Sequence, residues 1–242
     1  MKEAQYLQTI AALLHRQPVE ASLQAQDSHA LAQHLQNCAL RFYARSAAHR
    51  RRYFVNHVYQ KPMLDAMSAE AREHLLQAYL QAQGGTNRDW SHNAQRFCQV
   101  VEHEVRQGSL HPCWQDAATH CWTLYRTGLH QQSPPAFQKL SQLRINPTFE
   151  IMAYRYDPTQ PNEASPLAES TTPTINLGYY LHPTSYRAHW QRIDESILAA
   201  CQIVDSKMAL DSAAQQAGLS LEELRTILER LAKQGLFVAA EP

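Results

Sequence analysis

Two short apolar runs followed by three helical patterns dominate the last third of the chain. The apolar runs cover residues 175–181 and 186–190, and residues 182–185 between them read His-Pro-Thr-Ser. Proline and serine favour turns, and two apolar runs joined by a short connection are typical of an antiparallel hairpin. The region therefore predicts a hairpin that leads directly into helices, which leaves few ways to fold it.

The three helical patterns cover residues 193–204, followed by a turn at residues 205–207, then residues 208–217, and a segment that begins after Ser220 and ends at Gly235. Ser220 and the glutamate three residues later have the spacing of a capping box, which marks the start of a helix. A last apolar run completes the region at residues 236–238. Two strands, a tight turn and three helices predict a winged helix-turn-helix.

The preceding part of the chain has the pattern of a helical bundle. Apolar residues recur at helical spacing in about five or six segments, each ended by a proline, a glycine or a polar turn. One such helix is expected over residues 69–83, with Ser68 as its cap. The last segment is a short run that includes Leu140 and Leu143.

At Asn146 the apolar pattern changes to a period of two, which predicts a strand over residues 149–156. Residues 157–173 are rich in Pro, Ser, Thr and Glu and have no apolar period, so they predict a mobile loop. We therefore expect an α+β, mostly α chain. A helical bundle domain would cover residues 1–145, and a small winged helix-turn-helix, with a three-stranded sheet plus three helices, would cover residues 146–242.

Charge also differs between the two expected domains. Residues 1–145 carry 15 Lys and Arg against 10 Asp and Glu, whereas residues 146–242 carry 7 against 12. Such an asymmetry fits two modules with different surfaces. The formal net charge of the whole chain is zero, so it gives no support for bulk attraction to nucleic acid or to a membrane.

The N-terminus leads into a helix interrupted by Gln and His, which does not resemble a signal peptide. No segment approaches the roughly 18 apolar residues that a membrane span needs. The cysteines are an odd and scattered set, typical of free and mostly buried thiols in a reducing cytoplasm. They are Cys38, Cys98, Cys113, Cys121 and Cys201.

Thirteen histidines raise the possibility of a metal site. The best cases are the Glu102-His103-Glu104 triplet and a cluster formed by His111, Cys113, His120 and Cys121. Neither has the spacing of a known zinc motif, and the chain has no Cys-x-x-Cys, phosphate-binding glycine loop or Gly-x-Ser-x-Gly elbow. We expect no metal, cofactor or catalytic residue in this chain, although a Cys/His nucleophile pair stays open.

The densest positive feature is the segment His49-Arg50-Arg51-Arg52, with Arg41 and Arg45 one and two turns before it. One interpretation is a solvated helix end, where cations suit the helix dipole. The alternative is a patch that binds an acidic surface of a partner protein.

The last helix distinguishes the two uses of a winged helix, which are binding to nucleic acid and binding to a peptide. A DNA-reading helix needs a basic outer face, but here acidic and basic residues balance. They are Glu222, Glu223 and Glu229 against Arg225, Arg230 and Lys233. A peptide can instead add as a strand to an open sheet edge. The strand over residues 186–192 is the candidate edge, with Tyr186 and Trp190 on one face, unless both aromatic side chains are simply core.

The C-terminal region resembles the PqqD-like RiPP recognition element, a winged helix that binds leader peptides of ribosomally made, modified peptides. The resemblance rests on residues 194–198, on residues 205–207, where Ser206 stands in place of the usual Gly, and on residues 220–236. It implies that a leader pairs along the candidate strand and rests against the last helix. The residues implied are Tyr186, Arg187, Ala188, His189, Trp190, Arg192, Arg225, Leu228 and Glu229.

A helical module joined through the strand at residues 146–156 to such a domain is also similar to TglI-like and HvfC-like partner subunits of multinuclear non-haem iron oxidative enzymes. This resemblance implies a non-catalytic, cytoplasmic subunit that presents the core of a precursor peptide to an iron enzyme, which binds it as a heterodimer and holds the iron. Its contacts with that enzyme would include Arg41, Arg45, Arg50, Arg51 and Arg52. Two alternatives stay open: a winged-helix transcriptional regulator, and a helical PqqC-like enzyme fused to a recognition domain.

Overall fold

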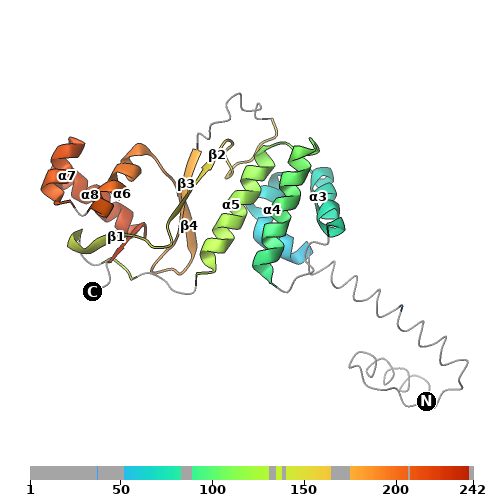
Figure 1. The fold of residues 1–242 in the computed structure, drawn as a ribbon, viewed down its shortest axis with the longest axis horizontal. Coiled ribbons are helices and arrows are strands. Elements are labelled where there is room, and N and C mark those ends of the chain that lie inside the picture. The colour runs from blue at the N-terminus through green and yellow to red at the C-terminus, as the bar shows by residue number, and fades with distance from the viewer. Residues whose placement is uncertain are drawn as a thin grey trace, which may run out of the picture. The chain divides into compact units, whose positions relative to one another are not determined.

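The computed structural model describes residues 52–82, 89–130, 135–137, 140–164, 175–206 and 208–239, together with Asn37. The chain divides into two compact units, residues 1–51 and residues 52–242, and the elements below belong to the second unit. The helices expected before residue 52 lie outside the described residues. The second unit is mostly helical with a small antiparallel sheet (Figure 1).

The first half of this unit consists of helices joined by short connections. Residues 52–59 are helical, and the elements that follow are η1 (Gln60–Leu64), α3 (Ala69–Gln81), α4 (Trp90–Arg106) and α5 (Cys113–Gly128). Ser68 caps α3 as predicted, because its hydroxyl accepts a hydrogen bond from the backbone N–H of Ala71. Where the structure describes them, no helix is long and apolar enough to cross a membrane.

These helices share one hydrophobic core. Its largest fully buried side chains include Tyr59, Tyr79, Phe97 and Trp114. The Tyr59 hydroxyl donates to the backbone oxygen of Ala94, so this buried polar group is satisfied. Four of the five cysteines are described, and all four are free thiols with little or no exposure, as predicted.

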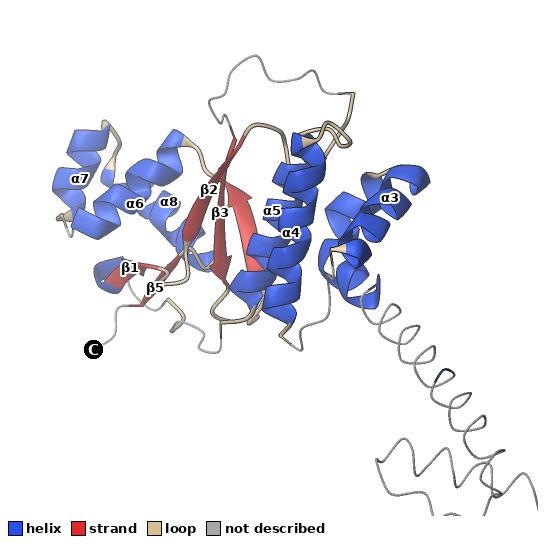
Figure 2. Ribbon diagram, turned by 45° about the vertical axis from the view of Figure 1, so that its right-hand side comes forward, coloured by secondary structure: helices blue, strands red, loops and turns tan. Residues whose placement is uncertain are grey.

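A three-stranded antiparallel sheet follows, in the order β2 (Glu150–Tyr154), β3 (Ile175–Leu181), β4 (Ala188–Arg192) (Figure 2). The strands expected over residues 149–156 and 175–181 are confirmed within two residues at each end. The third strand begins two residues later than predicted, at Ala188.

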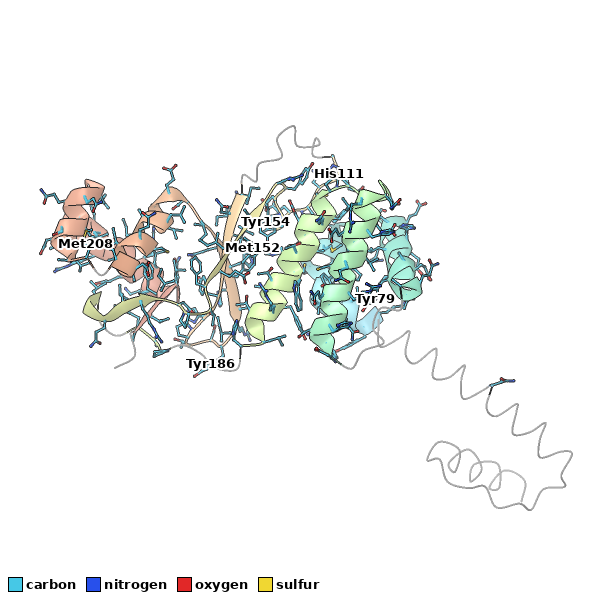
Figure 3. All side chains as sticks on the ribbon, viewed as in Figure 1. Tyr79, His111, Met152, Tyr154, Tyr186 and Met208 are labelled. Atoms are coloured by element: carbon cyan, nitrogen blue, oxygen red, sulfur yellow. The ribbon has the colours of Figure 1, made fainter. Side chains whose placement is uncertain are left out.

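Tyr186 explains the late start of β4. Its φ of 55° is in the left-handed region, which non-glycine residues seldom adopt. Its N–H donates to the backbone oxygen of His182, whose own N–H donates to the oxygen of Arg187, so these residues form the turn of the hairpin. Tyr186 is 70% exposed and lies outside the strand, and the prediction that it shares a strand face with Trp190 is wrong (Figure 3).

A second, two-stranded sheet was not predicted. It pairs β1 (Leu143–Ile145) with β5 (Phe237–Ala239), and the short helix η2 (Leu140–Gln142) precedes it. Leu143 was expected in a helical run, but it pairs with Ala239 instead. The final apolar run needs a partner for its backbone hydrogen bonds, and β1 supplies it.

Three helices lie between β4 and β5: α6 (Glu195–Ser206), α7 (Leu210–Ala217) and α8 (Leu221–Lys233). The capping box predicted at the start of α8 is present, with Ser220 and Glu223 bonded to each other's backbone N–H. Gly218 ends α7 in the left-handed conformation, as a glycine readily can. The buried faces of α6, α7 and α8 form a second core with Tyr180 of β3.

The sheet lies between these two groups of helices. Helix α5 packs on β3 and β4, and Tyr154, Leu177 and Tyr179 fill that side. On the other side, Tyr180 joins the core of α6–α8. The buried side chain of Asn146 fixes the sheet to the end of α8, because its Nδ2 donates to the backbone oxygens of both Leu181 and Gly235.

Residues 157–164, the described part of the predicted loop, make specific contacts with both halves. Asp157 forms an ion pair with Arg192 of β4, and Glu163 accepts a hydrogen bond from the indole N–H of Trp114 on α5. The rest of that loop, from residue 165, lies outside the described residues.

Candidate functional site

The strand β4 forms one edge of the three-stranded sheet. Two backbone hydrogen bonds show which residues of β4 bond to β3. The His182 N–H donates to the backbone oxygen of Arg187, and the Ile193 N–H donates to the backbone oxygen of Asn176, each at 2.9 Å. In an antiparallel pair, alternate residues direct both backbone groups toward the partner strand. Counting in twos from Arg187, residues 189 and 191 also bond to β3.

The intervening residues of β4 direct their backbone groups away from the sheet. They are Ala188, Trp190 and Arg192, which the register pairs with Leu181, Tyr179 and Leu177. Within the described ranges, no other strand pairs with this side of β4. Such an edge presents unpaired N–H and C=O groups to an incoming strand.

The opposite edge, β2, has the same length as β4 but fewer residues with outward backbone groups, and it is closed at one end. Because β3 uses its even-numbered residues for β4, its odd-numbered residues bond to β2, and only Ile151 and Ala153 of β2 direct backbone groups outward. The next outward N–H, that of Arg155, already donates to the carboxylate of Asp116 at 2.9 Å. The two edges therefore differ in the number of outward backbone groups that a peptide could use, and they offer an internal comparison.

Trp190 is the large apolar side chain on β4, and it is 40% exposed. The ring makes a T-shaped contact with the His120 ring on α5, with 5.5 Å between centroids and an interplanar angle of 84°. An aromatic side chain that is half packed and half exposed can add contact area to a bound strand at little cost in entropy.

A chain of buried hydrogen bonds lies behind Trp190. The Nδ1 atom of His120 is 2.6 Å from the Tyr179 hydroxyl, which is 2.8 Å from the Tyr154 hydroxyl. Figure 3 shows Tyr154 between the sheet and α5. This chain connects α5, β3 and β2, and no sequence motif indicated it.

Burial sets the ionisation of this chain. It lowers the pKa of His120 to about 4, against the opposing effect of the Asp157 charge. It raises the pKa of Tyr154 to about 12 and that of Tyr179 further above its ordinary value. All three side chains are therefore neutral at pH 7, and Nδ1 of His120 accepts the Tyr179 O–H when the ring proton is on Nε2.

Of the other residues expected on the strand, Arg187 and His189 lie on the face turned toward α6–α8, whereas Ala188 and Arg192 share the face of Trp190. His189 is exposed and stacks on Tyr180, with 6.2 Å between ring centroids. Arg187 is exposed just before β4 begins. The side chain of Gln191, on the same face, has its Nε2 atom buried without a hydrogen-bond acceptor.

The three residues expected on α8 have different environments. Arg225 is exposed and Glu229 is half-buried. Leu228 is fully buried, because its spacing places it on the same face of α8 as Leu224 and Leu231. The structure therefore assigns Leu228 to the core, and its side chain does not reach the surface.

Of the arginines expected to bind a partner, only Arg52 is among the described residues. Its guanidinium forms an exposed ion pair with Glu73 of α3. The others, Arg41, Arg45, Arg50 and Arg51, lie outside the described residues.

The candidate metal ligands make other contacts. Glu104 pairs with His74, Glu102 pairs with Arg106, and Nδ1 of His111 accepts the backbone N–H of Cys113. Among the described residues, no three His, Cys, Asp or Glu side chains converge as metal ligands would.

Two depressions occur on the described surface. One, of about 850 Å³, lies between α3 and the segment that joins α4 to α5, with His74, His111 and Glu163 in its lining. The other, of about 310 Å³, lies between α6 and α7 beside Met208. Neither lining includes a residue of β4.

No protein-family model matches the chain, and no curated protein is detectably similar to it.

Proposed function

We propose that the protein binds an extended peptide as a fourth strand along the outer side of β4. The observation that carries this proposal is the set of outward backbone groups of Ala188, Trp190 and Arg192, which have no strand partner in the described structure. Backbone hydrogen bonds to these groups would supply affinity, and side-chain contacts on either face would supply specificity.

The order of elements supports this proposal. Strands β2, β3 and β4 are followed in the sequence by three helices, α6, α7 and α8. The buried faces of these helices share one core with Tyr180 of β3. We interpret residues 146–242 as a winged-helix recognition domain on this basis, and the helices before it as a bundle that carries the domain. The balanced charges on the outer face of α8 favour a peptide over nucleic acid as the ligand.

In the cell, the peptide would be the leader of a ribosomally synthesised precursor, and the protein would be a cytoplasmic, non-catalytic subunit of a modifying enzyme. The partner would be an iron-dependent oxidative enzyme that contains the metal and binds this chain through its basic N-terminal segment. Holding the leader raises the effective concentration of the core peptide at the partner's active site.

Proline substitutions test the proposal, because proline removes one N–H and is tolerated on an edge strand where that N–H faces outward. Ala188→Pro removes an outward donor from β4, and Ala153→Pro removes one from the opposite edge. Ala188→Val is the control for side-chain size, because valine is similar in volume to proline and keeps the backbone N–H. The probe is a phage-displayed library of random linear peptides longer than β4, selected on the full chain.

The expected result is that selected peptides bind the wild type, Ala153→Pro and Ala188→Val alike, and bind Ala188→Pro at least about tenfold more weakly. That factor corresponds to about one lost hydrogen bond. Failure to select any peptide, or equal binding to Ala188→Pro, would overturn the proposal. Salt-dependent binding to duplex DNA with no peptide binding would favour a transcriptional regulator.

A further inference from the structure

Three side chains that carry or can acquire positive charge gather where the outer side of β4 begins. Arg187 and His189 flank Ala188 in the sequence, and the His182 ring lies 5.0 Å from the His189 ring. The two imidazoles are held in place, since Nδ1 of His182 accepts backbone N–H groups of the turn and Nε2 of His189 is 3.3 Å from the Ser185 hydroxyl. This group of Arg187, His182 and His189 is called the hairpin cation cluster below.

No acidic side chain balances the hairpin cation cluster in the described structure. The sequence has no Asp or Glu between Glu169 and Asp194. Among the ion pairs of the described residues, the one on this hairpin joins Arg192 to Asp157 at the far end of β4. Burial lowers the pKa of His189, and any positive charge on His182 or Arg187 lowers it further. The guanidinium of Arg187 is therefore the permanent positive charge of the cluster at pH 7.

The cluster and Trp190 lie on opposite faces of the sheet. The Tyr180–His189 pair faces α6–α8, whereas the Tyr179–Trp190 pair faces α5 and His120. Residues that lie directly opposite each other on neighbouring strands point to the same face, with Cβ atoms about 5 Å apart. A peptide residue opposite residue 187 or 189 would therefore face the cations, and one opposite residue 190 would face the tryptophan.

We infer that the peptide bound to β4 carries an Asp or Glu side chain facing the hairpin cation cluster and an apolar side chain facing Trp190. Since these contacts are on opposite faces, the acidic and apolar residues are separated by an odd number of positions: one if the acid lies opposite His189, three if it lies opposite Arg187. This inference rests on the proposed function and adds a sequence rule for the ligand.

The ion pair would be partly exposed, so its effect on affinity is modest. Exposed pairs change an equilibrium by up to about fivefold, and less at high salt. Its main contribution is to fix the register and direction of the peptide, because a charge opposite the wrong residue has no partner.

The test selects the same random peptide library on the full-length wild type, on Arg187→Gln and on Arg155→Gln. Arg155 is the matched control, because it is an exposed arginine beside the opposite edge. Peptides selected on the wild type and on Arg155→Gln are expected to share an acidic residue at an odd distance from an apolar one. The acidic position is expected to lose its enrichment on Arg187→Gln.

A selected peptide is then compared with its own Glu→Gln or Asp→Asn version by fluorescence anisotropy at pH 7 and low salt. The wild type is expected to bind the acidic version up to about fivefold more tightly, and Arg187→Gln is expected to bind both versions alike. Selected peptides that bind Ala188→Pro more weakly than the wild type, but have no enriched acidic residue, would overturn this inference and leave the proposed function intact. The same holds if the acidic and apolar residues are separated by an even number of positions. A library that yields no peptide overturns both.

Discussion

The Nδ1 atom of His120 on α5 lies 2.6 Å from the hydroxyl oxygen of Tyr179 on β3. This contact joins a helix of the first core to the central strand of the sheet, across 59 residues of sequence. The same Tyr179 hydroxyl contacts Tyr154 of β2, and the His120 ring supports Trp190 of β4. The buried hydroxyl of Tyr179 therefore connects α5 with β3, the strand that pairs with β4.

Tyr179→Phe tests the contribution of this hydroxyl to stability. The substitution leaves His120 and Tyr154 without their shared partner inside the protein, which costs about 1–3 kcal/mol in the free energy of unfolding. Urea unfolding of the full chain measures the loss. Tyr186→Phe is the control, since that side chain is 70% exposed and its change should stay within about 0.5 kcal/mol. Equal losses of stability from the two substitutions would contradict a stabilising role for the Tyr179 hydroxyl.

Because His120 is buried, the stability of the protein is expected to depend on pH. Burial lowers its pKa in the folded protein to about 4, from 6.5 for the free side chain. The unfolded chain therefore binds the proton more tightly, so stability from this residue is complete above about pH 6.5 and is lost as the pH falls toward 4. The loss reaches about 3 kcal/mol over that window, since one pKa unit corresponds to about 1.4 kcal/mol.

His120→Gln removes this titration while keeping a polar side chain. Urea unfolding at pH 7 and pH 5 is expected to show a smaller loss for the variant than for the wild type, by about 2 kcal/mol. Parallel curves for the two proteins would mean that His120 titrates normally and is not buried as described.

Gln191→Met is expected to stabilise the protein or leave its stability unchanged. The Nε2 atom of Gln191 is buried without an acceptor, and an unsatisfied buried polar group costs about 1–3 kcal/mol. Methionine has a similar length and no such requirement. Thermal unfolding measures the effect, and a loss of more than about 1 kcal/mol would show that the amide has a partner in solution.

Local signals predicted much of this fold. The Ser220 capping box, the Ser68 cap and the glycine that ends α7 each depend on residues within one or two turns of each other, so a short stretch of sequence contains the whole interaction. Strand β2 followed from its period-two pattern, and β3 followed from its short apolar run beside a turn. The burial of Leu228 was also readable from its spacing with Leu224 and Leu231, but the resemblance favoured a surface role.

Features that depend on distant residues could not be predicted. The Asn146 side chain bonds to Gly235, 89 residues away, and the β1–β5 pairing spans a similar distance. The left-handed Tyr186 follows from closure of the hairpin rather than from its own preference. Which backbone groups of β4 face outward depends on its register with β3, and alternation of apolar residues alone does not determine that register.

Trp190→Ala tests the role of the exposed aromatic side chain in binding. Loss of a large, partly packed aromatic contact is expected to weaken a selected peptide by about tenfold or more. Fluorescence anisotropy measures this on the full chain. Trp90→Ala is the matched control, because Trp90 on α4 has a similar exposure, 45% against 40%, and lies outside the sheet. Equal weakening by both substitutions would argue against a specific contact at β4.

Amide hydrogen exchange on the full chain, followed by NMR, tests the strand-addition proposal most directly. In the free protein, the amides of residues 188, 190 and 192 should exchange quickly, whereas those of residues 189 and 191 should be protected by their bonds to β3. A saturating selected peptide should protect the amides of Ala188, Trp190 and Arg192 and leave that of Ala153 on the opposite edge unchanged. Protection of those three amides before peptide is added, or continued fast exchange at saturation, would contradict the proposal that a peptide pairs with β4.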